Sequence, residues 1–196
     1  LNRVIGLIPL TLHRCQLIAH AQHLFVEVAL CEAIPNSIQD ILSSNRIILP
    51  NGQAKVATFY SINNCLTGLK GIYFGNFLLK QVVAHLQVAQ PQLKSFVTLS
   101  PIPGLKSWLN TDSRAEAFGL EPQDIETLES PLWFKDELFA AKTQKKLRQA
   151  ALAYLIDRQP NSHRLQDSVA RFHLGNGARI ENVHWLADTS ERGLSN

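Results

Sequence analysis

The sequence has no methionine, few cysteines and no long apolar run. Without a methionine the chain has no translation start of its own, so we expect the native amino terminus to lie elsewhere. Cys15, Cys31 and Cys65 form no C-x-x-C pair, which argues against a structural zinc site and favours a reducing compartment. No apolar run reaches the roughly 20 residues of a membrane span. We therefore expect a cytoplasmic protein without a membrane partner, or a mitochondrial or peroxisomal one in a eukaryote.

A strong excess of charge of either sign is also missing. The formal net charge is +3, from 19 basic and 16 acidic side chains. The basic residues are scattered apart from a short group at Lys142, Lys145, Lys146 and Arg148, so the sequence argues against a nucleic-acid partner. A composition that is 45% hydrophobic and 18% charged is that of an ordinary globular protein, long enough for a real core.

The first half of the chain alternates strand and helix patterns. Branched and aromatic residues predict strands over residues 23–30, 55–62 and 95–99. Apolar residues at helical spacing predict a long helix over residues 76–90, which Pro91 ends. A crossover of this length joins neighbouring parallel strands in a right-handed unit. We therefore predict an α/β fold in which the second and third strands are parallel neighbours.

The second half reads as mainly helical. Residues 105–157 follow helical patterns interrupted by prolines, and the clearest helix covers residues 142–156. A last helix is predicted to end near His173, and residues 179–186 read as a strand. No internal repeat or low-complexity tract accompanies these elements.

A glycine-rich segment lies between the second predicted strand and the long helix. Gly68, Gly71 and Gly75 place a flexible loop where that helix opens. Free backbone N–H groups at such a position, together with the helix dipole, favour an anion such as a pyrophosphate. The spacing matches neither the dinucleotide-binding fingerprint nor the Walker pattern. From the residues alone, a plain tight turn is an equally good interpretation.

Two short strings set a reactive side chain among residues that restrict the backbone. In the first, Pro101 disfavours helical geometry at Ser100, which follows the third predicted strand. In the second, His173 ends a helical pattern just before Gly175 and Gly177, where the chain can turn sharply. A serine and a histidine that meet in a fold can move a proton or hold an oxyanion. Taken alone, however, a serine before a proline is more often a turn former.

Six ordered blocks of the chain, the two strings included, resemble the malonyl-CoA decarboxylase family. The blocks are residues 25–30 (FVEVAL), 58–62 (TFYSI), 75–83 (GNFLLKQVV), 99–104 (LSPIPG), 170–178 (ARFHLGNGA) and 182–190 (NVHWLADTS). The family also has a helical domain before its catalytic domain and a tyrosine-bearing segment after it. We therefore expect residues 23–196 to be the catalytic domain and residues 1–22 to be a linker or the remnant of the preceding domain.

The resemblance implies a fold and a binding site. Malonyl-CoA decarboxylases share the GCN5-related acetyltransferase fold, a splayed mixed sheet flanked by helices in which a glycine-rich loop binds coenzyme A. Coenzyme A is part of the substrate, so the resemblance implies no separate cofactor and no metal, and full-length members are expected to form homo-oligomers. The implied contacts with coenzyme A are Gly68, Lys70, Gly71, Ile72, Tyr73, Phe74, Gly75 and Asn76.

The resemblance also implies a reaction, the decarboxylation of malonyl-CoA to acetyl-CoA and CO2 through a thioester enolate. Ser100 and His173 match the family's catalytic serine and histidine, which contact the malonyl group and protonate the enolate, respectively. Two positions depart from the family pattern: Ser168 stands where members often have proline, and Tyr73 is bulky for the loop. An acyl-CoA transferase of the same fold, or a decarboxylating loading domain of a polyketide synthase, is the alternative, and a binding domain without activity is a third reading.

Overall fold

The computed structural model describes residues 24–45, 49–50, 52–64 and 74–195. The chain divides into two structural units, Leu1–Leu99 and Ser100–Asn196. The first unit contains the sheet and the second is helical, in keeping with the change of pattern in the sequence.

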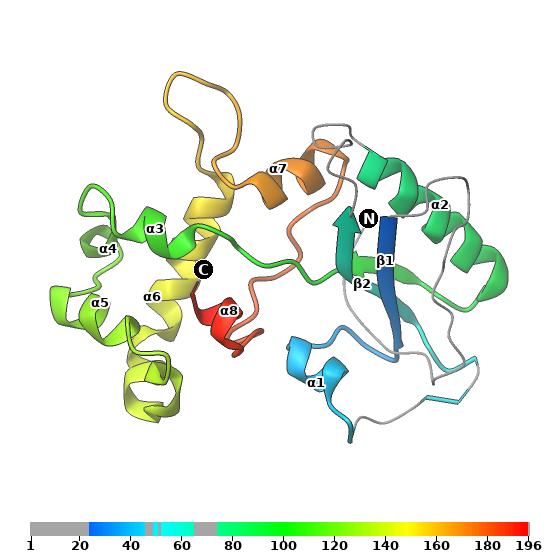
Figure 1. Cartoon of the computed structure of the whole chain (residues 1–196), viewed down its shortest axis with the longest axis horizontal. Coiled ribbons are helices and arrows are strands. Elements are labelled where there is room, and N and C mark those ends of the chain that lie inside the picture. The colour runs from blue at the N-terminus through cyan, green and yellow to red at the C-terminus, as the bar shows by residue number, and fades with distance from the viewer. Residues whose placement is uncertain (1–23, 46–48, 51, 65–73, 196) are drawn as a thin grey trace. The chain divides into compact units, whose positions relative to one another are not determined.

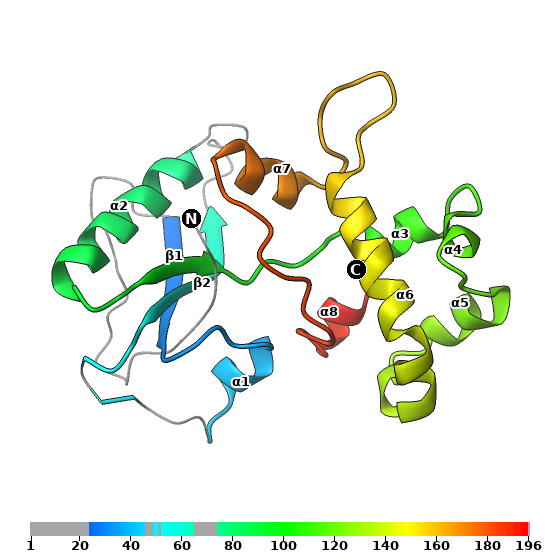
Figure 2. The same cartoon turned by 180° about the vertical axis from the view of Figure 1, so that it is seen from behind.

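Among the described residues, the sheet of the first unit has three strands in the order β1 (Leu24–Cys31), β2 (Val56–Asn64) and β3 (Ser95–Thr98). β1 is antiparallel to β2, whereas β2 and β3 are parallel. Helix α2 (Phe74–Ala89) connects β2 to β3 in chain order and runs alongside the sheet (Figures 1 and 2). The predicted α/β unit with parallel second and third strands is therefore confirmed.

Burial explains why β2 is the central strand. Its residues Val56, Ala57, Thr58 and Phe59 are all buried, so both faces of the strand are covered. Such continuous burial is expected of a strand between two neighbours with helices packed on the sheet. On α2, Leu79, Val82 and Leu86 are buried at helical spacing, while Val88 is 83% exposed.

The sheet opens beyond Phe59. The ladder between β2 and β3 ends where Phe59 pairs with Thr98, whereas β2 continues to Asn64 in its pairing with β1. The register between β1 and β2 also shifts near this point, so Tyr60 is an extra residue between the Val28 and Glu27 pairs. A bulge of this kind bends and twists a strand. Strand β3 thus leaves β2 where the chain reaches Ser100.

A short helix, α1 (Ile38–Leu42), covers part of β1. Ser37 caps it by accepting a hydrogen bond from the Asp40 N–H at 3.3 Å. Ile41 is 4% exposed and packs with Ala29 of β1.

The second unit is built around one long helix. Helix α6 (Glu137–Ile156) supplies Ala150 and Tyr154 to a core that also contains Trp108. The predicted helix over residues 142–156 is confirmed. It begins earlier than predicted, at Glu137, where Asp136 is its N-cap. The other elements are α3 (Leu105–Leu109), α4 (Arg114–Ala117), α5 (Pro122–Leu128), the 3-10 helix η2 (Trp133–Lys135), α7 (Ser168–Gly175) and α8 (Glu191–Leu194).

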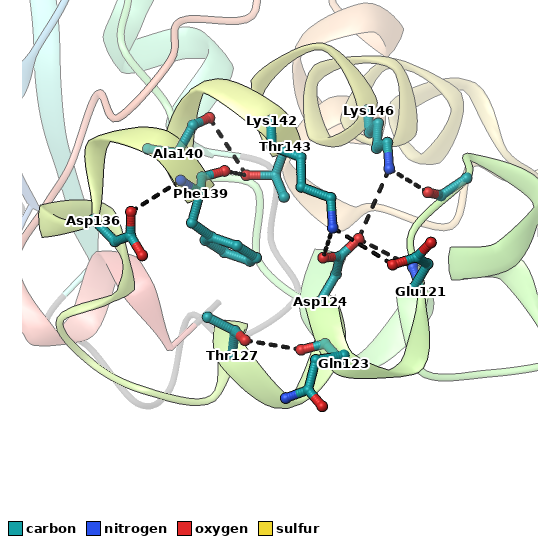
Figure 3. Close-up of polar contacts among 11 residues, drawn as sticks. Glu121, Gln123, Asp124, Thr127, Asp136, Phe139, Ala140, Lys142, Thr143 and Lys146 are labelled. Atoms are coloured by element: carbon teal, nitrogen blue, oxygen red, sulfur yellow. Dashed lines mark hydrogen bonds and ion pairs between the residues drawn. The ribbon is translucent and has the colours of Figure 1, made fainter.

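A charged network ties α5 to α6. Asp124 is 2% exposed and accepts hydrogen bonds from the Glu121 N–H at 3.1 Å and from Lys142 Nζ at 2.6 Å. Lys146 Nζ lies 3.8 Å from the same carboxylate (Figure 3). A carboxylate this deeply buried requires such partners. Two lysines of the basic group in the sequence are therefore part of the internal structure of this unit.

The prediction of a strand over residues 179–186 is wrong. These residues form no strand, and the side chains find partners on helices instead. Asn182 Oδ1 accepts a hydrogen bond from Arg148 of α6 at 3.2 Å, and the Trp185 ring lies 5.7 Å from the Trp133 ring of η2. The three strands of the sheet lie within residues 24–98, so in the described part of the second unit this segment has no strand beside which to pair.

Candidate active site

Ser100 directly follows the end of the parallel pair. The Leu99 N–H donates to the Phe59 carbonyl at 3.2 Å, which keeps the chain beside β2 up to that residue. Pro101 has no N–H to continue a ladder and disfavours helical geometry at Ser100. Ser100 is half-buried at this change of direction. The local arrangement predicted from the sequence is thus present.

The turn after Ser100 leads into α3. Its last residue, Gly104, has φ +85° and is the N-cap of that helix. This left-handed conformation strongly favours glycine. The Tyr154 hydroxyl donates to the Pro103 carbonyl at 2.8 Å, and a Cβ on Gly104 would lie 2.8 Å from the same hydroxyl oxygen. Glycine is therefore required here by both the backbone angle and the packing.

His173 lies in the last turn of α7, a helix with both ends fastened. At its start, Asp167 Oδ1 accepts from the Ala170 N–H at 2.5 Å. At its end, the His173 carbonyl accepts from the N–H groups of Asn176 at 3.1 Å and Ala178 at 3.0 Å. Caps of this kind satisfy backbone groups that the helix itself leaves unpaired. They fix the backbone from which the imidazole projects.

The structure brings Ser100 and His173 together. Ser100 Oγ lies 3.4 Å from His173 Nε2, although the two residues are 73 positions apart. The separation is at the long end of the hydrogen-bond range. The His173 ring also packs at a steep angle, 77°, against Phe172, with 4.7 Å between the ring centres. Both side chains are half-buried and belong to the same structural unit.

With the imidazole protonated on Nδ1, the serine hydroxyl donates to Nε2; with the other tautomer, Nε2–H donates to the serine oxygen. In either form the pair can share a proton. A neighbouring reactant could exchange a proton with the imidazole, because histidine titrates near neutral pH. The arrangement suits proton transfer next to a hydroxyl that orients a polar substrate group.

The expected coenzyme A contacts cannot be placed as a set. Gly68, Lys70, Gly71, Ile72 and Tyr73 lie outside the described residues. The remaining three, Phe74, Gly75 and Asn76, form the first turn of α2, which begins two residues earlier than predicted. The loop as a binding site stays a prediction.

Two other features bear on the chemistry of the described chain. Within the ranges that the structure describes, no three His, Cys, Asp or Glu side chains gather as a metal site would require. Among the described helices, none combines the length and the apolar character needed to cross a membrane.

Sequence reasoning missed two residues that hold the pair in place. Tyr154 fastens the turn after Ser100, and Asp167 caps the helix that carries His173. Burial raises the pKa of the Tyr154 hydroxyl, and the charges of Asp167 and Asp157 raise it further. Burial likewise raises the pKa of Asp167, which is 1% exposed. A tertiary contact distinguishes Tyr154, whereas an N-cap aspartate before a helical run is a local signal that could have identified Asp167.

Comparison with known proteins places the chain. The sequence model of the family described as Malonyl-CoA decarboxylase C-terminal domain matches residues 14–196. The mitochondrial malonyl-CoA decarboxylase of Anser anser anser is 33% identical over 88% of this chain, and that of Mus musculus is 33% identical over 93%. The chain covers 39% and 43% of those two proteins, so it spans about two fifths of their length.

Solved structures agree with the sequence comparison. The malonyl-CoA decarboxylase of Rhodopseudomonas palustris matches with a TM-score of 0.77 and 41% identity, over 87% of this chain and 40% of that one. The malonyl-CoA decarboxylase of Agrobacterium vitis matches with a TM-score of 0.77 and 43% identity, over 88% and 43%. The family model covers nearly the whole chain, and the match includes both Ser100 and His173. The chain therefore belongs to the malonyl-CoA decarboxylase family.

Proposed function

We propose that this chain carries the reaction centre of an enzyme that converts malonyl-CoA to acetyl-CoA and CO2. The observation that supports it most directly is the 3.4 Å approach of Ser100 Oγ to His173 Nε2 in a member of this family. The relatives bear the name of that activity. A carbon–carbon cleavage followed by protonation needs an orienting group and a proton donor, and the pair offers both.

The chemistry assigns a role to each member of the pair. When the malonyl carboxylate turns out of the thioester plane, its bond to the α-carbon breaks and the electron pair enters the thioester as an enolate, releasing CO2. In our proposal Ser100 donates a hydrogen bond to the malonyl group and so favours this orientation. His173, as imidazolium, then gives its proton to the α-carbon, which yields acetyl-CoA and neutral imidazole. Solvent returns the proton before the next turnover.

In our proposal coenzyme A is held by the backbone between residues 68 and 76. Free N–H groups before and in the first turn of α2 would face the pyrophosphate, where the helix dipole adds a favourable partial charge. The nucleotide is part of the substrate, so the proposal needs no further cofactor. Gly75→Asp places a negative charge at this point and is expected to abolish binding of coenzyme A in isothermal titration. Val88→Asp adds the same charge at an exposed position of the same helix and is expected to leave binding unchanged.

The decisive assay follows acetyl-CoA and CO2 from malonyl-CoA in the complete gene product that contains this chain. His173→Ala is expected to lower kcat by about 10²–10⁴-fold with a small change in KM, the usual effect of removing a general acid. Ser100→Ala is expected to lower kcat comparably. His163→Ala and Ser107→Ala remove the same side chains at exposed positions and are expected to retain full activity.

Two results would contradict the proposal. If His173→Ala still formed acetyl-CoA at the parent rate, the proton would have to come from another group. If malonyl-CoA remained intact until an amine or carrier-protein thiol was added, the acyltransferase alternative would be favoured. Running the assay with and without such an acceptor separates the two reactions.

A further inference from the structure

We infer that Tyr154 is a positioning residue for Ser100, acting through the backbone of the turn that follows it. The inference rests on the proposed function, because it concerns the same pair of side chains. Tyr154 lies on α6 and is 5% exposed. The hydrogen bond that its hydroxyl donates goes to neither Ser100 nor His173. Its contact is with the carbonyl of Pro103, three residues after the serine.

The turn is stiff, so a displacement at Pro103 is carried to Ser100. Pro101 and Pro103 each restrict φ to about −65°. Between them, Ile102 packs against the core cluster that contains Tyr154. A segment with so few free torsions moves largely as a unit. The hydrogen bond from Tyr154 therefore fixes the position of the turn and, through the turn, the position of Ser100.

The hydroxyl matters here as well as the ring. The ring is already held by Trp108, with 5.4 Å between ring centres and a tilt of 51°. The hydroxyl alone reaches the Pro103 carbonyl, and the close approach of its oxygen excludes a side chain at Gly104. A tyrosine hydroxyl is protonated at neutral pH and so acts as a donor here. Burial and the charges of Asp167 and Asp157 raise its pKa further.

The charge of Asp167 also acts on the Tyr154 hydroxyl. Asp167, one of the carboxylates that raise the pKa of the Tyr154 hydroxyl, caps the helix that carries His173. A change at Tyr154 is expected to alter the 3.4 Å approach of the pair rather than only the stability of the unit.

The test compares two buried hydroxyls on the same helix. Tyr154→Phe removes the hydroxyl bound to Pro103, and Thr143→Val removes a fully buried hydroxyl that donates to the Phe139 carbonyl at 2.8 Å. In the complete gene product, Tyr154→Phe is expected to lower kcat about tenfold with KM for malonyl-CoA changed less than about twofold, because small displacements of a reacting group are costly. Thr143→Val is expected to keep kcat within about twofold.

A second variant tests the route of the effect. In a Ser100→Ala background, Tyr154→Phe is expected to cause no further loss of kcat, because the residue that it positions is already gone. Equal losses of kcat in Tyr154→Phe and Thr143→Val, or a full additional loss in the Ser100→Ala background, would overturn the inference. Each of these results would assign Tyr154 a purely structural role.

A measurement without turnover separates this inference from the proposed function. The imidazole signals of His173, assigned by their loss in His173→Gln, are recorded by NMR in the chain described here. Tyr154→Phe is expected to shift them, since Ser100 Oγ is a close neighbour of the ring, and Thr143→Val is expected to leave them in place. Unshifted His173 signals in Tyr154→Phe would refute the positioning role. Failure of the parent enzyme to release CO2 would refute the proposed function alone.

Discussion

Two buried aspartates of the helical unit are expected to respond to pH in opposite directions. Asp167 and Asp124 are 1% and 2% exposed, and each lies at the start of a helix. Burial raises the pKa of Asp167 above its usual 3.8. Burial acts in the same direction on Asp124, but hydrogen bonds from Lys142 and the Glu121 N–H, with the charge of Lys146, outweigh it and lower the pKa.

The sign of each effect follows from proton linkage. The folded protein holds the Asp167 proton to higher pH than the unfolded chain does. The contribution of Asp167 to the free energy of unfolding is therefore largest below about pH 3.8 and falls as pH rises to the folded pKa. For Asp124 the folded pKa is the lower one. Its contribution is present above about pH 3.8 and is lost as pH falls through the folded pKa.

Asparagine substitutions remove the ionisable group and keep one oxygen that can cap the helix, while the second oxygen becomes an amide donor. The loss of that oxygen does not depend on pH, so the pH dependence of each difference isolates the titration of the aspartate. The stability of the parent relative to Asp167→Asn is expected to decrease as pH rises. The stability of the parent relative to Asp124→Asn is expected to increase. The two difference curves should therefore have slopes of opposite sign between acidic and neutral pH.

Alanine at position 167 sets the scale of the experiment. Asp167→Ala removes the acceptor for the Ala170 N–H, and loss of an N-cap costs about 1 kcal/mol. With a denaturant slope of about 1–2 kcal/mol per molar urea for a unit of this size, the urea midpoint should lie roughly 0.5–1 M lower than that of Asp167→Asn. The comparison holds at any pH, because neither substitute is ionised.

Tryptophan fluorescence reports the unfolding of the unit that contains both aspartates. The three tryptophans of the sequence, Trp108, Trp133 and Trp185, all lie in Ser100–Asn196. Urea titrations of the chain and its variants from about pH 3 to about pH 7.5 give each difference curve. An Asp167→Asn difference that rose with pH would show that burial does not dominate at Asp167, and an Asp124→Asn difference that fell would show that the lysines do not dominate at Asp124; either would refute the reasoning.

Three further predictions concern other parts of the described chain. Burial raises the pKa of the Cys31 thiol from 9.0 to about 11, so at pH 8 it should be alkylated about 100-fold more slowly than an ordinary thiol, as peptide mass spectrometry would reveal. Trp108→Phe removes the hydrogen bond from Nε1 to Asp157 Oδ2 at 2.7 Å and is expected to cost about 1–2 kcal/mol by urea unfolding, a loss that an unchanged midpoint would contradict. Burial and then the charge of Arg148 lower the pKa of His184, so an NMR titration should give a pKa below 6.5. Arg148→Gln should raise this pKa, and an unchanged pKa in that variant would exclude the arginine as a cause.

The fold of the first unit was predictable because local patterns and topology agreed there. Branched residues marked the strands, and the length of the helix between them required a parallel pair. The segment over residues 179–186 looked similar in composition but failed to form a strand. A strand depends on a neighbour to complete its hydrogen bonds, and composition does not say whether one is within reach. Packing of Trp185 on Trp133 replaced that pairing.

The candidate site divides in the same way. Backbone-restricting residues flank Ser100 and His173. The family resemblance favoured a catalytic role for both over the ordinary alternatives, a turn-forming serine and a histidine at a helix end. Their 3.4 Å approach depends on how α7 and the turn before α3 are anchored, which is a tertiary property. Tyr154 supplies one anchor by a tertiary contact that no local pattern marks, whereas Asp167 supplies the other as a local N-cap.

Residues that act through local backbone geometry and residues that act through tertiary contacts respond differently to substitution. Residues that restrict the backbone act on their immediate neighbours, so Pro101 and Gly104 can be recognised from the chain itself. Residues that position by a single tertiary hydrogen bond act only in the folded state, and their removal leaves local structure intact. We therefore expect Tyr154→Phe, which keeps the buried ring, to change the rate more than the stability, and substitutions at Gly104 to change both. At Gly104 the left-handed backbone and the Tyr154 oxygen 2.8 Å from any added Cβ oppose a side chain together.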